Sequence, residues 1–321
     1  MSSEDPIPAS RTTGSAAGAS TRPTQRLLTP GQGWQGIRPK TLPLAVVPVL
    51  LGGLLAWRAT GQLNLPLLLV TLLTALLIQA GTNLFNDAKD GLRGNDGPER
   101  IGPTRLTSSG QATARQVMGS AWLLFGLALL GGLYLVLQGG PAILLLGLAS
   151  LAAGWAYSGG PKPLSHTPWG EVFVIGFFGV AAVGGTYFLQ AGDLPLPAIL
   201  VGLALGVQAA AVLIVNNTRD RDGDAQAGRR TLALVLGRRG SGWAYAVMML
   251  VPFPVLALAL QSVGDATLAL YWGALPFAIW LIWRFTAQHC GVGMNRQLAL
   301  TALAQLLLGA LLALTLLLPV D

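Results

Sequence analysis

Residues 66–90 read PLLLVTLLTALLIQAGTNLFNDAKD and join a long apolar run to a cluster of amides and acids. The run over 66–85 carries no charged residue, and a helix of that length, at 1.5 Å per residue, crosses a hydrocarbon core of about 30 Å. Asn83, Asp87 and Asp90 follow at positions i, i+4 and i+7. A helix that continues through them places all three on one polar stripe. The stretch therefore predicts a membrane-spanning helix that ends in a polar site.

The rest of the chain repeats this apolar pattern. Of its 321 residues 52% are hydrophobic and only 10% are charged, whereas soluble domains carry about 25% charged residues. This deficit excludes a large soluble domain and predicts an all-α integral membrane protein. Nine transmembrane helices are expected in residues 34–321, after a disordered tail over residues 1–33 that is rich in Ser, Thr, Gly and Pro. The expected spans are 41–57, 66–85, 117–137, 141–157, 170–189, 196–216, 243–262, 268–285 and 297–319.

The basic residues predict the orientation of the nine spans. With the amino terminus in the cytoplasm, 19 of the 20 Lys and Arg residues fall on the cytoplasmic side, and only Arg58 falls on the other. The positive-inside rule then favours a multi-pass protein of the cell (cytoplasmic or inner) membrane. We expect its amino terminus and polar loops to be cytoplasmic and its carboxyl terminus to be external.

Seven of the 13 acidic residues lie in two loops that this topology places on the same side. The second loop repeats the pattern of the first, with Asn216, Asp220 and Asp224 at i, i+4 and i+8. Carboxylates that share one helix face repel each other, so a compensating cation is expected. Carboxylate and amide oxygens suit Mg²⁺, which completes its coordination with water and substrate phosphates. Two facing stripes therefore predict a diphosphate held through Mg²⁺, with the basic residues of the same loops as further anion contacts.

Several motifs carry a resemblance to a known family. The stretches NDAKD (86–90) and DRDGD (220–224), together with nine expected helices, resemble the UbiA superfamily of intramembrane aromatic prenyltransferases. RPKTLP (38–43), GPTRLTSSG (102–110), YSGGP (157–161) and GRRTLA (228–233) resemble its 1,4-dihydroxy-2-naphthoate branch, which serves menaquinone synthesis. The resemblance spans residues 34–319.

The resemblance implies an Mg²⁺-dependent transfer of a polyprenyl group from a polyprenyl diphosphate to 1,4-dihydroxy-2-naphthoate, within membrane lipid. It implies that Asn83, Asp87, Asp90, Asp220 and Asp224 bind the metal and the diphosphate, and the four acids are the expected catalytic groups. Tyr157 is expected to orient the aromatic acceptor. The implied phosphate contacts are Arg38, Lys40, Asn83, Arg105, Lys162 and Arg229.

One position departs from the general superfamily pattern. A third acid is expected four residues after Asp90, but the chain has Gly94 there and its next acid is Asp96. This shifted spacing is characteristic of the naphthoate branch, and it leaves the role of Asp96 open.

Other functions remain as alternatives. Sister prenyltransferases acting on 4-hydroxybenzoate or another ring acceptor share the acidic motifs. A CDP-alcohol phosphatidyltransferase lacks support, because the acids downstream of Asp222 and Gly223 that its signature requires are missing. A transporter would place its polar site near the bilayer midplane, whereas these acids gather at one membrane face. The sequence pI of about 10.2 is explained by topology and phosphate binding, so no nucleic-acid partner is expected.

Overall fold

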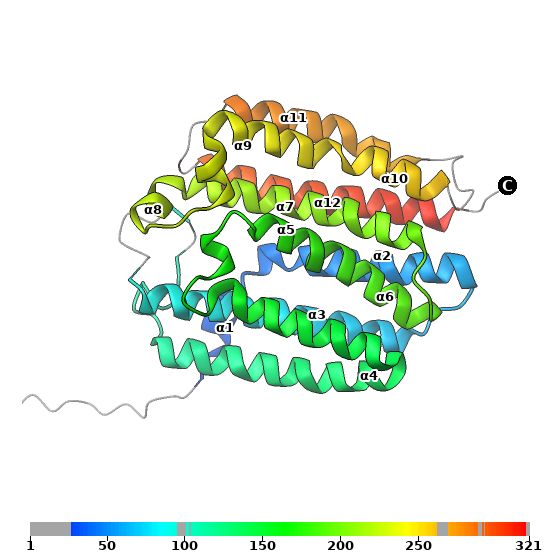
Figure 1. Ribbon diagram of the computed structural model, residues 1–321, viewed down its shortest axis with the longest axis horizontal. Coiled ribbons are helices and arrows are strands. Elements are labelled where there is room, and N and C mark those ends of the chain that lie inside the picture. Colours follow the sequence, from blue (N-terminus) through cyan, green and yellow to red (C-terminus); the bar gives the residue numbers. More distant parts are fainter. Residues whose placement is uncertain are drawn as a thin grey trace, which may run out of the picture.

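The computed structural model describes residues 27–94, 101–102, 104–261, 269–287, 291 and 293–318, and these residues fold into a bundle of helices (Figure 1). The helices are α1 (Pro30–Gly36), α2 (Pro43–Thr60), α3 (Leu65–Leu92), α4 (Ala114–Ser158), α5 (Gly170–Val174), α6 (Ala182–Ala191), α7 (Leu196–Arg219), α8 (Arg221–Gln226), α9 (Leu232–Leu250), α10 (Pro252–Gln261), α11 (Leu275–Ala287) and α12 (Gly293–Leu317). Short helical turns occupy η1 (Pro39–Thr41), η2 (Leu164–His166) and η4 (Leu270–Ala274), and the π-helical segment η3 (Ile175–Ala181) joins α5 to α6.

Seven helical stretches in the described part of the chain are long and apolar enough to cross a membrane. They are Pro43–Thr60, Leu65–Leu92, Ala114–Ser158, Gly170–Ala191, Leu196–Arg219, Leu232–Gln261 and Gly293–Leu317. This count is lower than the expected nine for two reasons. The expected spans 117–137 and 141–157 both fall within α4, and the expected span 268–285 corresponds to α11, which has only 13 residues, preceded by the turn η4.

The helix α4 is not one straight rod. Its 45 residues would extend about 68 Å at 1.5 Å per residue, and Gly140 interrupts them with φ 65° and ψ −154°, a conformation that glycine adopts without steric cost. Gly154, in the second arm, lies against Thr82 of α3 and Phe125 of the first arm. Because residues 29 positions apart meet, the chain reverses at Gly140 and both arms pack beside α3 (Figure 1).

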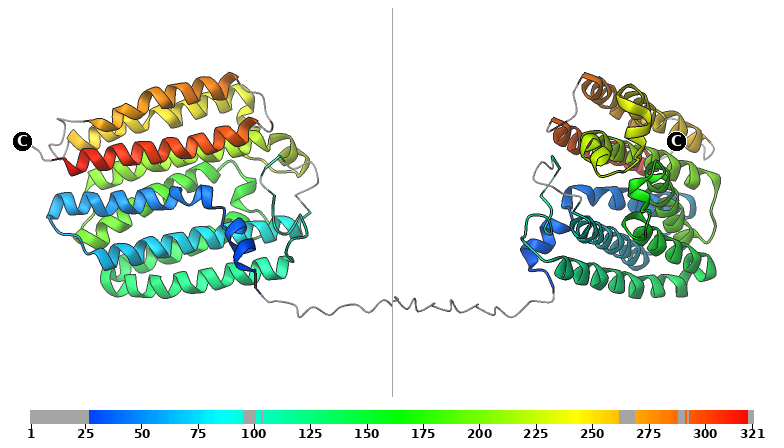
Figure 2. Two further views of the ribbon diagram at one scale, coloured as in Figure 1. Left: turned by 180° about the vertical axis from the view of Figure 1, so that it is seen from behind. Right: turned by 60° about the vertical axis from the view of Figure 1, so that its left-hand side comes forward.

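The core centres on α7, which packs against α5 and η3, α9, α10 and α12. The closest approach joins η3 to α7, where Gly179 lies against the backbone of Gly202 and Gly206. Small residues let helix backbones approach closely, and dispersion contacts then hold helices together in lipid. The two further views show the same side-by-side arrangement from behind and obliquely (Figure 2).

The start of the described chain corrects the expected boundary of the tail. Residues 1–26 lie outside the described residues, but residues 30–33 belong to α1. Thr29 caps this helix, and its capping box with Gln32 satisfies backbone N–H groups at the helix start. Gln32 also donates a hydrogen bond to the carbonyl of Gln111 at 2.7 Å. Helical structure is therefore present before residue 34, because a sequence rich in Pro and Gly still carries a helix-start signal.

Candidate active site

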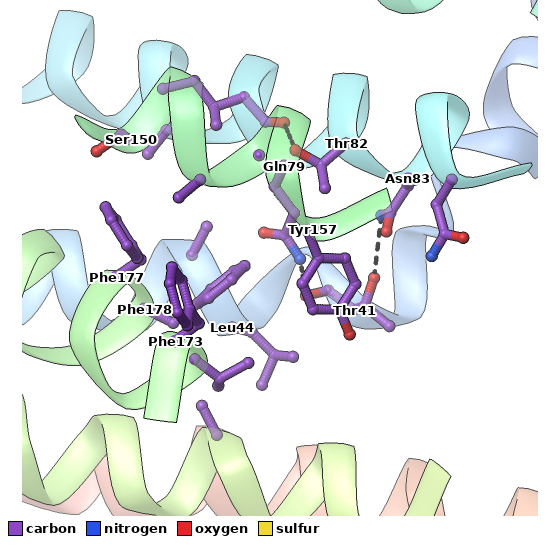
Figure 3. A pocket seen from close by; sticks show the side chains of 18 of the residues that line it. Thr41, Leu44, Gln79, Thr82, Asn83, Ser150, Tyr157, Phe173, Phe177 and Phe178 are labelled. Atoms are coloured by element: carbon purple, nitrogen blue, oxygen red, sulfur yellow. Dashed lines mark hydrogen bonds between the residues drawn. The ribbon is translucent and has the colours of Figure 1, made fainter. Parts of the chain in front are cut away.

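A cavity of about 1150 Å³ opens among α2, α3, α4, the α5–α6 stretch and α7. At the end of the bundle near α8, its walls carry amides, carboxylates and arginines. Further along the bundle its walls are apolar, and Figure 3 shows Phe173, Phe177 and Phe178 on one side with Tyr157 and Asn83 nearer the polar part. One space thus joins a charged end to an apolar chamber.

The helix α3 presents three polar side chains to the charged end. Asn83, Asn86 and Asp90 line the cavity at spacings of three and four residues, as one helix face requires. The side-chain amide nitrogen of Asn83 donates to the backbone carbonyl of Ile37 at 2.8 Å, and this bond fixes the orientation of the side-chain amide. Asn86, which sequence reasoning did not select, accepts a hydrogen bond from Arg105. Asp87 is absent from the lining, so the structure does not bring it to the cavity face that carries Asn83 and Asp90.

The carboxylate of Asp87 supports a loop. It is 3% exposed, and its two oxygens accept the backbone N–H groups of Leu106 and Thr107 at 2.9 and 3.0 Å. These bonds fix the turn that follows Arg105. Asp87 therefore contributes to the site by holding the segment from which Arg105 reaches into the cavity.

The second acidic motif lies where the helix changes direction. The helix α7 ends at Arg219, Asp220 adopts φ −91° and ψ 7°, and α8 begins at Arg221. Because of this break, residues on several sides of the motif line the same cavity. They are Asn216, Asn217, Arg219, Asp220, Asp222, Gly223 and Asp224.

Arg229 joins the two acidic motifs. One guanidinium nitrogen lies 3.1 Å from Asp90 of α3, and the other lies 3.1 Å from Asp224 of α8. Asp90 also pairs with Arg105 at 2.7 Å. Gly228, with φ 67°, provides the turn that returns the chain so that Arg229 faces the cavity. The two motifs therefore face each other across a buried network of two arginines and two carboxylates.

The charge state of Asp224 depends on its surroundings. Burial raises its pKa from 3.8 to about 6, Arg229 opposes the rise, and the nearby Asp220 and Asp90 add to it. Asp220 is less buried and pairs with Arg219 at 2.6 Å. An added cation between these carboxylates would favour their ionised forms.

The remaining expected contacts divide into two groups. Arg38 and Tyr157 line the cavity, and Arg38 adopts φ 54°, a conformation uncommon outside glycine that concentrates at functional sites. Lys40 and Lys162 are exposed and do not line the cavity. The structure therefore does not bring these two lysines to the predicted phosphate site. Asp96 lies outside the described residues.

Sequence reasoning also missed Glu171. This side chain is 2% exposed and accepts a hydrogen bond from Asn217 at 2.9 Å. Its second oxygen has no hydrogen-bond partner in the described part of the chain. A single acid at the start of an apolar segment gives no signal of this pairing, because Asn217 follows 46 positions later.

The donor chemistry suits a hard cation, although no cluster of three acidic, histidine or cysteine side chains in a metal-binding arrangement occurs among the described residues. Asp90, Asp220 and Asp224 supply carboxylate oxygens, and Asn83 supplies an amide oxygen. Mg²⁺ usually takes one or two protein carboxylates and fills its other positions with water and phosphate oxygens. The residues present therefore fit Mg²⁺ bound together with a phosphorylated substrate.

The fold and the site define a class of protein. It is a helical membrane protein with a large cavity that is charged at the end of the bundle and apolar along it. The chain belongs to the UbiA prenyltransferase family, whose model matches residues 45–291.

Proteins of known name resemble the chain over most of its length. A 1,4-dihydroxy-2-naphthoate octaprenyltransferase of Mycobacterium tuberculosis is 40% identical over 203 residues, covering 63% of this chain and 68% of that protein. The protein of the same name from Bacillus subtilis is 30% identical over 285 residues, covering 88% and 91%. The one from Haemophilus influenzae is 36% identical and covers 76% and 82%.

Solved structures share the fold at low sequence identity. The apo structure of a UbiA homolog from Aeropyrum pernix K1 matches with a TM-score of 0.60 and 16% identity, covering 86% of this chain and 96% of that one. A UbiA homolog from Archaeoglobus fulgidus bound to GPP and Mg²⁺ matches with a TM-score of 0.57 and 15% identity, covering 87% and 99%. These likenesses confirm the all-helical membrane fold that the apolar segments predict.

Proposed function

We propose that this protein transfers a polyprenyl group from an allylic polyprenyl diphosphate to 1,4-dihydroxy-2-naphthoate, releasing CO₂ and diphosphate and giving demethylmenaquinol for menaquinone biosynthesis. The observation that carries the proposal is the cavity that joins the Arg105, Arg229 and acidic network to an apolar chamber. A polyprenyl diphosphate has the same division, with an anionic head and a hydrocarbon tail. The names of the relatives from three bacteria support naphthoate as the acceptor.

The diphosphate end is assigned to the charged part of the cavity. Asp90, Asp220, Asp224 and Asn83 would hold Mg²⁺, which when bound neutralises charge on the diphosphate oxygens. Structural neighbours bound to GPP or DMAPP with Mg²⁺ support this cofactor. Asp87 was expected in the same ligand set, and its direct role in metal binding stays a prediction.

The arginines supply preorganised positive charge at the leaving group. Arg38, Arg105 and Arg229 line the charged end, and fixed donors of this kind stabilise negative charge as it develops in a transition state. As the allylic C–O bond breaks, its electron pair leaves with the diphosphate, and an allylic cation remains in the chamber. Lys40 and Lys162 would act only if their exposed side chains moved toward the substrate.

The acceptor step follows from the electron balance. A ring electron pair forms the new C–C bond at the carbon that carries the carboxylate. The bond from the ring to that carboxylate then breaks, its electron pair returns to the ring, and CO₂ departs. Only substitution at that carbon restores aromaticity by loss of the carboxylate. Tyr157 lines the cavity between the charged end and the phenylalanines, where it can orient the ring.

The phenylalanines protect and stabilise the cation. Phe173 and Phe177 are stacked with centroids 6.0 Å apart, and both line the chamber. Aromatic faces attract cations electrostatically, and an apolar wall excludes the water that would hydrolyse a carbocation. We therefore assign stabilisation of the cation and exclusion of water to the α5–α6 stretch, and binding of the diphosphate to the ends of α3 and α7.

The membrane topology is part of the proposal. Counting the two arms of α4 separately, and counting η4 with α11 as one span, gives the nine spans expected over residues 34–321. In this arrangement both acidic motifs lie at the bundle end opposite Arg58. We assign that end and the amino terminus to the cytoplasm, and the carboxyl terminus to the outside, on the positive-inside rule.

A product assay tests the function directly. Membranes containing the full chain are incubated with Mg²⁺, a polyprenyl diphosphate and either 1,4-dihydroxy-2-naphthoate or 4-hydroxybenzoate, and the products are identified by mass spectrometry. The expected result is a decarboxylated, prenylated naphthoquinol that is absent with Asp220→Ala. Prenylated hydroxybenzoate without any naphthoquinol would instead assign the chain to a sister enzyme, and no prenylated product would overturn the proposal.

A further inference from the structure

A second pocket lies at the same end of the bundle as the acidic motifs, but different residues line it. It has a volume of about 570 Å³ and is lined by residues of α7, α9, α11 and α12, none of which lines the large cavity. Arg238, Arg239 and Trp243 come from α9, Phe285 comes from α11, and Thr218 comes from the last turn of α7. The proposed reaction uses none of these residues.

The pocket combines two arginines with an apolar wall. Arg238 and Arg239 are exposed at the start of α9, directly after the interruption at Gly237. Trp243 follows one turn later and is 75% exposed. Tryptophan concentrates where a membrane meets water, with its ring among the headgroups. The arginines therefore lie at headgroup depth, and the apolar side chains lie on the hydrocarbon side of them.

Thr218 provides an independent sign of a polar ligand. Thr218 is 3% exposed and lines the pocket, and its hydroxyl has no hydrogen-bond partner among the described residues. Threonine within a helix commonly donates to the carbonyl four residues earlier. A buried hydroxyl without a partner costs free energy, and a ligand oxygen in the pocket would satisfy it.

We infer that this pocket binds the phosphate headgroup of an anionic phospholipid, with Arg238 and Arg239 at the phosphate and an acyl chain along Trp243 and Phe285. Basic pockets between transmembrane helices recognise lipid headgroups in this way. Positive charge at headgroup depth favours an anionic lipid, and the apolar wall favours a lipid over a free anion. The site is separate from the cavity in which the polyprenyl diphosphate is proposed to bind.

Binding is measured on the full-length protein, delipidated in a neutral detergent, by native mass spectrometry. Phosphatidylglycerol, phosphatidylcholine and inorganic phosphate are titrated separately. We expect phosphatidylglycerol to bind in preference to phosphatidylcholine. The Arg238→Gln, Arg239→Gln double variant should bind phosphatidylglycerol about 30-fold more weakly, since each basic residue near an anionic lipid contributes roughly fivefold.

Matched variants separate this site from a general effect of charge. Arg115→Gln with Arg296→Gln removes two exposed arginines at the same end of the bundle but outside the pocket, and this control should bind as the wild type does. Arg238→Lys with Arg239→Lys keeps the charge and should retain most of the binding. Thr218→Val, which has nearly the same shape but no hydroxyl, should bind severalfold more weakly, with a melting temperature no lower than that of the wild type.

Three results would overturn the inference. Equal binding of the two lipids would mean that the headgroup charge is not recognised. Competition by inorganic phosphate at the concentration at which phosphatidylglycerol binds would identify a site for free anions. An equal loss of binding in the control variant that lacks Arg115 and Arg296 would show that binding depends on the overall charge of the protein and not on this pocket.

Discussion

The ends of α3 and α7 both bring Asn and Asp side chains to one cavity, but they do so with different backbones. The helix α3 continues through Asp90 to Leu92, whereas α7 stops at Arg219 and the chain turns at Asp220 into α8. On the continuous helix only one face reaches the cavity, so Asn83 and Asp90 line it and Asp87 does not. At the end of α7, the break in the helix lets consecutive residues from more than one helix face line the cavity.

Because of this difference, the two similar motifs have different structural roles in the site. The unbroken stripe belongs to a helix of 28 residues, and its Asp90 lies between Arg105 and Arg229. The broken end carries Asp224 on a helix of only 6 residues, and Arg229 ties it to α3. We conclude that α3 supplies the fixed wall of the charged site and that α8 is positioned against it through Arg229.

Replacing Asp90 with Asn should have the largest effect. The change keeps the shape of the side chain but removes the negative charge that positions both guanidinium groups. We expect turnover to fall about 10³-fold, at the upper end of the cost of removing one preorganised electrostatic group. The measurement is single-turnover prenyl transfer by purified protein in detergent with saturating Mg²⁺.

The control for Asp90 is Asp193→Asn, which removes an exposed acid in the segment between α6 and α7. Its turnover should match the wild type. Activity of Asp90→Asn within tenfold of the wild type would show that the unbroken stripe is not the fixed wall of the site.

Much of the fold was predictable because membrane spans depend on long, uniform apolar runs. The expected span 170–189 matches the helical stretch Gly170–Ala191, and 196–216 lies within α7. The expected spans end at residue 137 and resume at residue 141, and the structure confirms a break between them at Gly140. The π-helical geometry of η3 has no such signal, because it arises from packing against α7.

The site was less predictable than the fold, because side-chain direction depends on the rotation of a helix about its own axis. Spacing alone grouped Asp87 with Asn83, but the real cavity face contains Asn86 instead. The pairing of Arg229 with Asp90 joins residues 139 positions apart and has no local signal. Lys162 has the charge expected for a phosphate contact, but charge does not reveal that the side chain is exposed and lies outside the cavity lining.

Replacing Asp87 with Asn should give the next largest effect, and it separates a positioning role from a metal-binding role. The amide keeps one acceptor but turns an NH₂ group toward a backbone N–H of Leu106 or Thr107. We expect about 2 kcal/mol of lost stability, as for other hydrogen bonds to a charged group, and a turnover reduced roughly tenfold as Arg105 loses its support. The measurements are the apparent melting temperature and the Mg²⁺ concentration needed for half-maximal activity.

A positioning role predicts a lower melting temperature with an unchanged Mg²⁺ requirement. A large rise in the Mg²⁺ requirement with an unchanged melting temperature would make Asp87 a metal ligand after all. Asp193→Asn is again the control, because Asp193 is exposed between α6 and α7 and does not line the cavity.

The glycine contact between η3 and the first half of α7 should affect stability more than chemistry. A Cβ atom at Gly179 would collide with the backbone of Gly202 and Gly206, whereas a Cβ at Gly176 would meet nothing within 4 Å. Gly179→Ala should therefore destabilise the fold by about 1–3 kcal/mol, as overpacking does. Gly176→Ala, in the same π-helical segment, should leave the melting temperature unchanged. Equal melting temperatures for the two variants would mean that this contact does not hold α7 in place.

His166 should give the smallest effect, confined to acidic pH. Its carbonyl accepts the backbone N–H of Arg230 at 2.9 Å, so it anchors the chain just after Arg229. Burial, aided by the positive charge of Arg229, lowers the pKa of His166 from 6.5 to about 4. Between pH 6.5 and 4 the unfolded chain therefore binds a proton that the folded protein does not, and stability falls as the pH falls through this window.

His166→Gln removes that proton uptake, so the melting temperature of the variant should fall less steeply than that of the wild type from pH 6.5 to 4. Asp224 has a raised pKa of about 6 and acts in the opposite direction, because the folded protein takes up its proton first as the pH falls. Asp224 is present in both proteins, so its contribution cancels in the difference between their slopes. Parallel melting curves across this range would show that the imidazole is as accessible to protons in the folded protein as in the unfolded chain, and that η2 packs more loosely beside Arg229 than its contacts indicate.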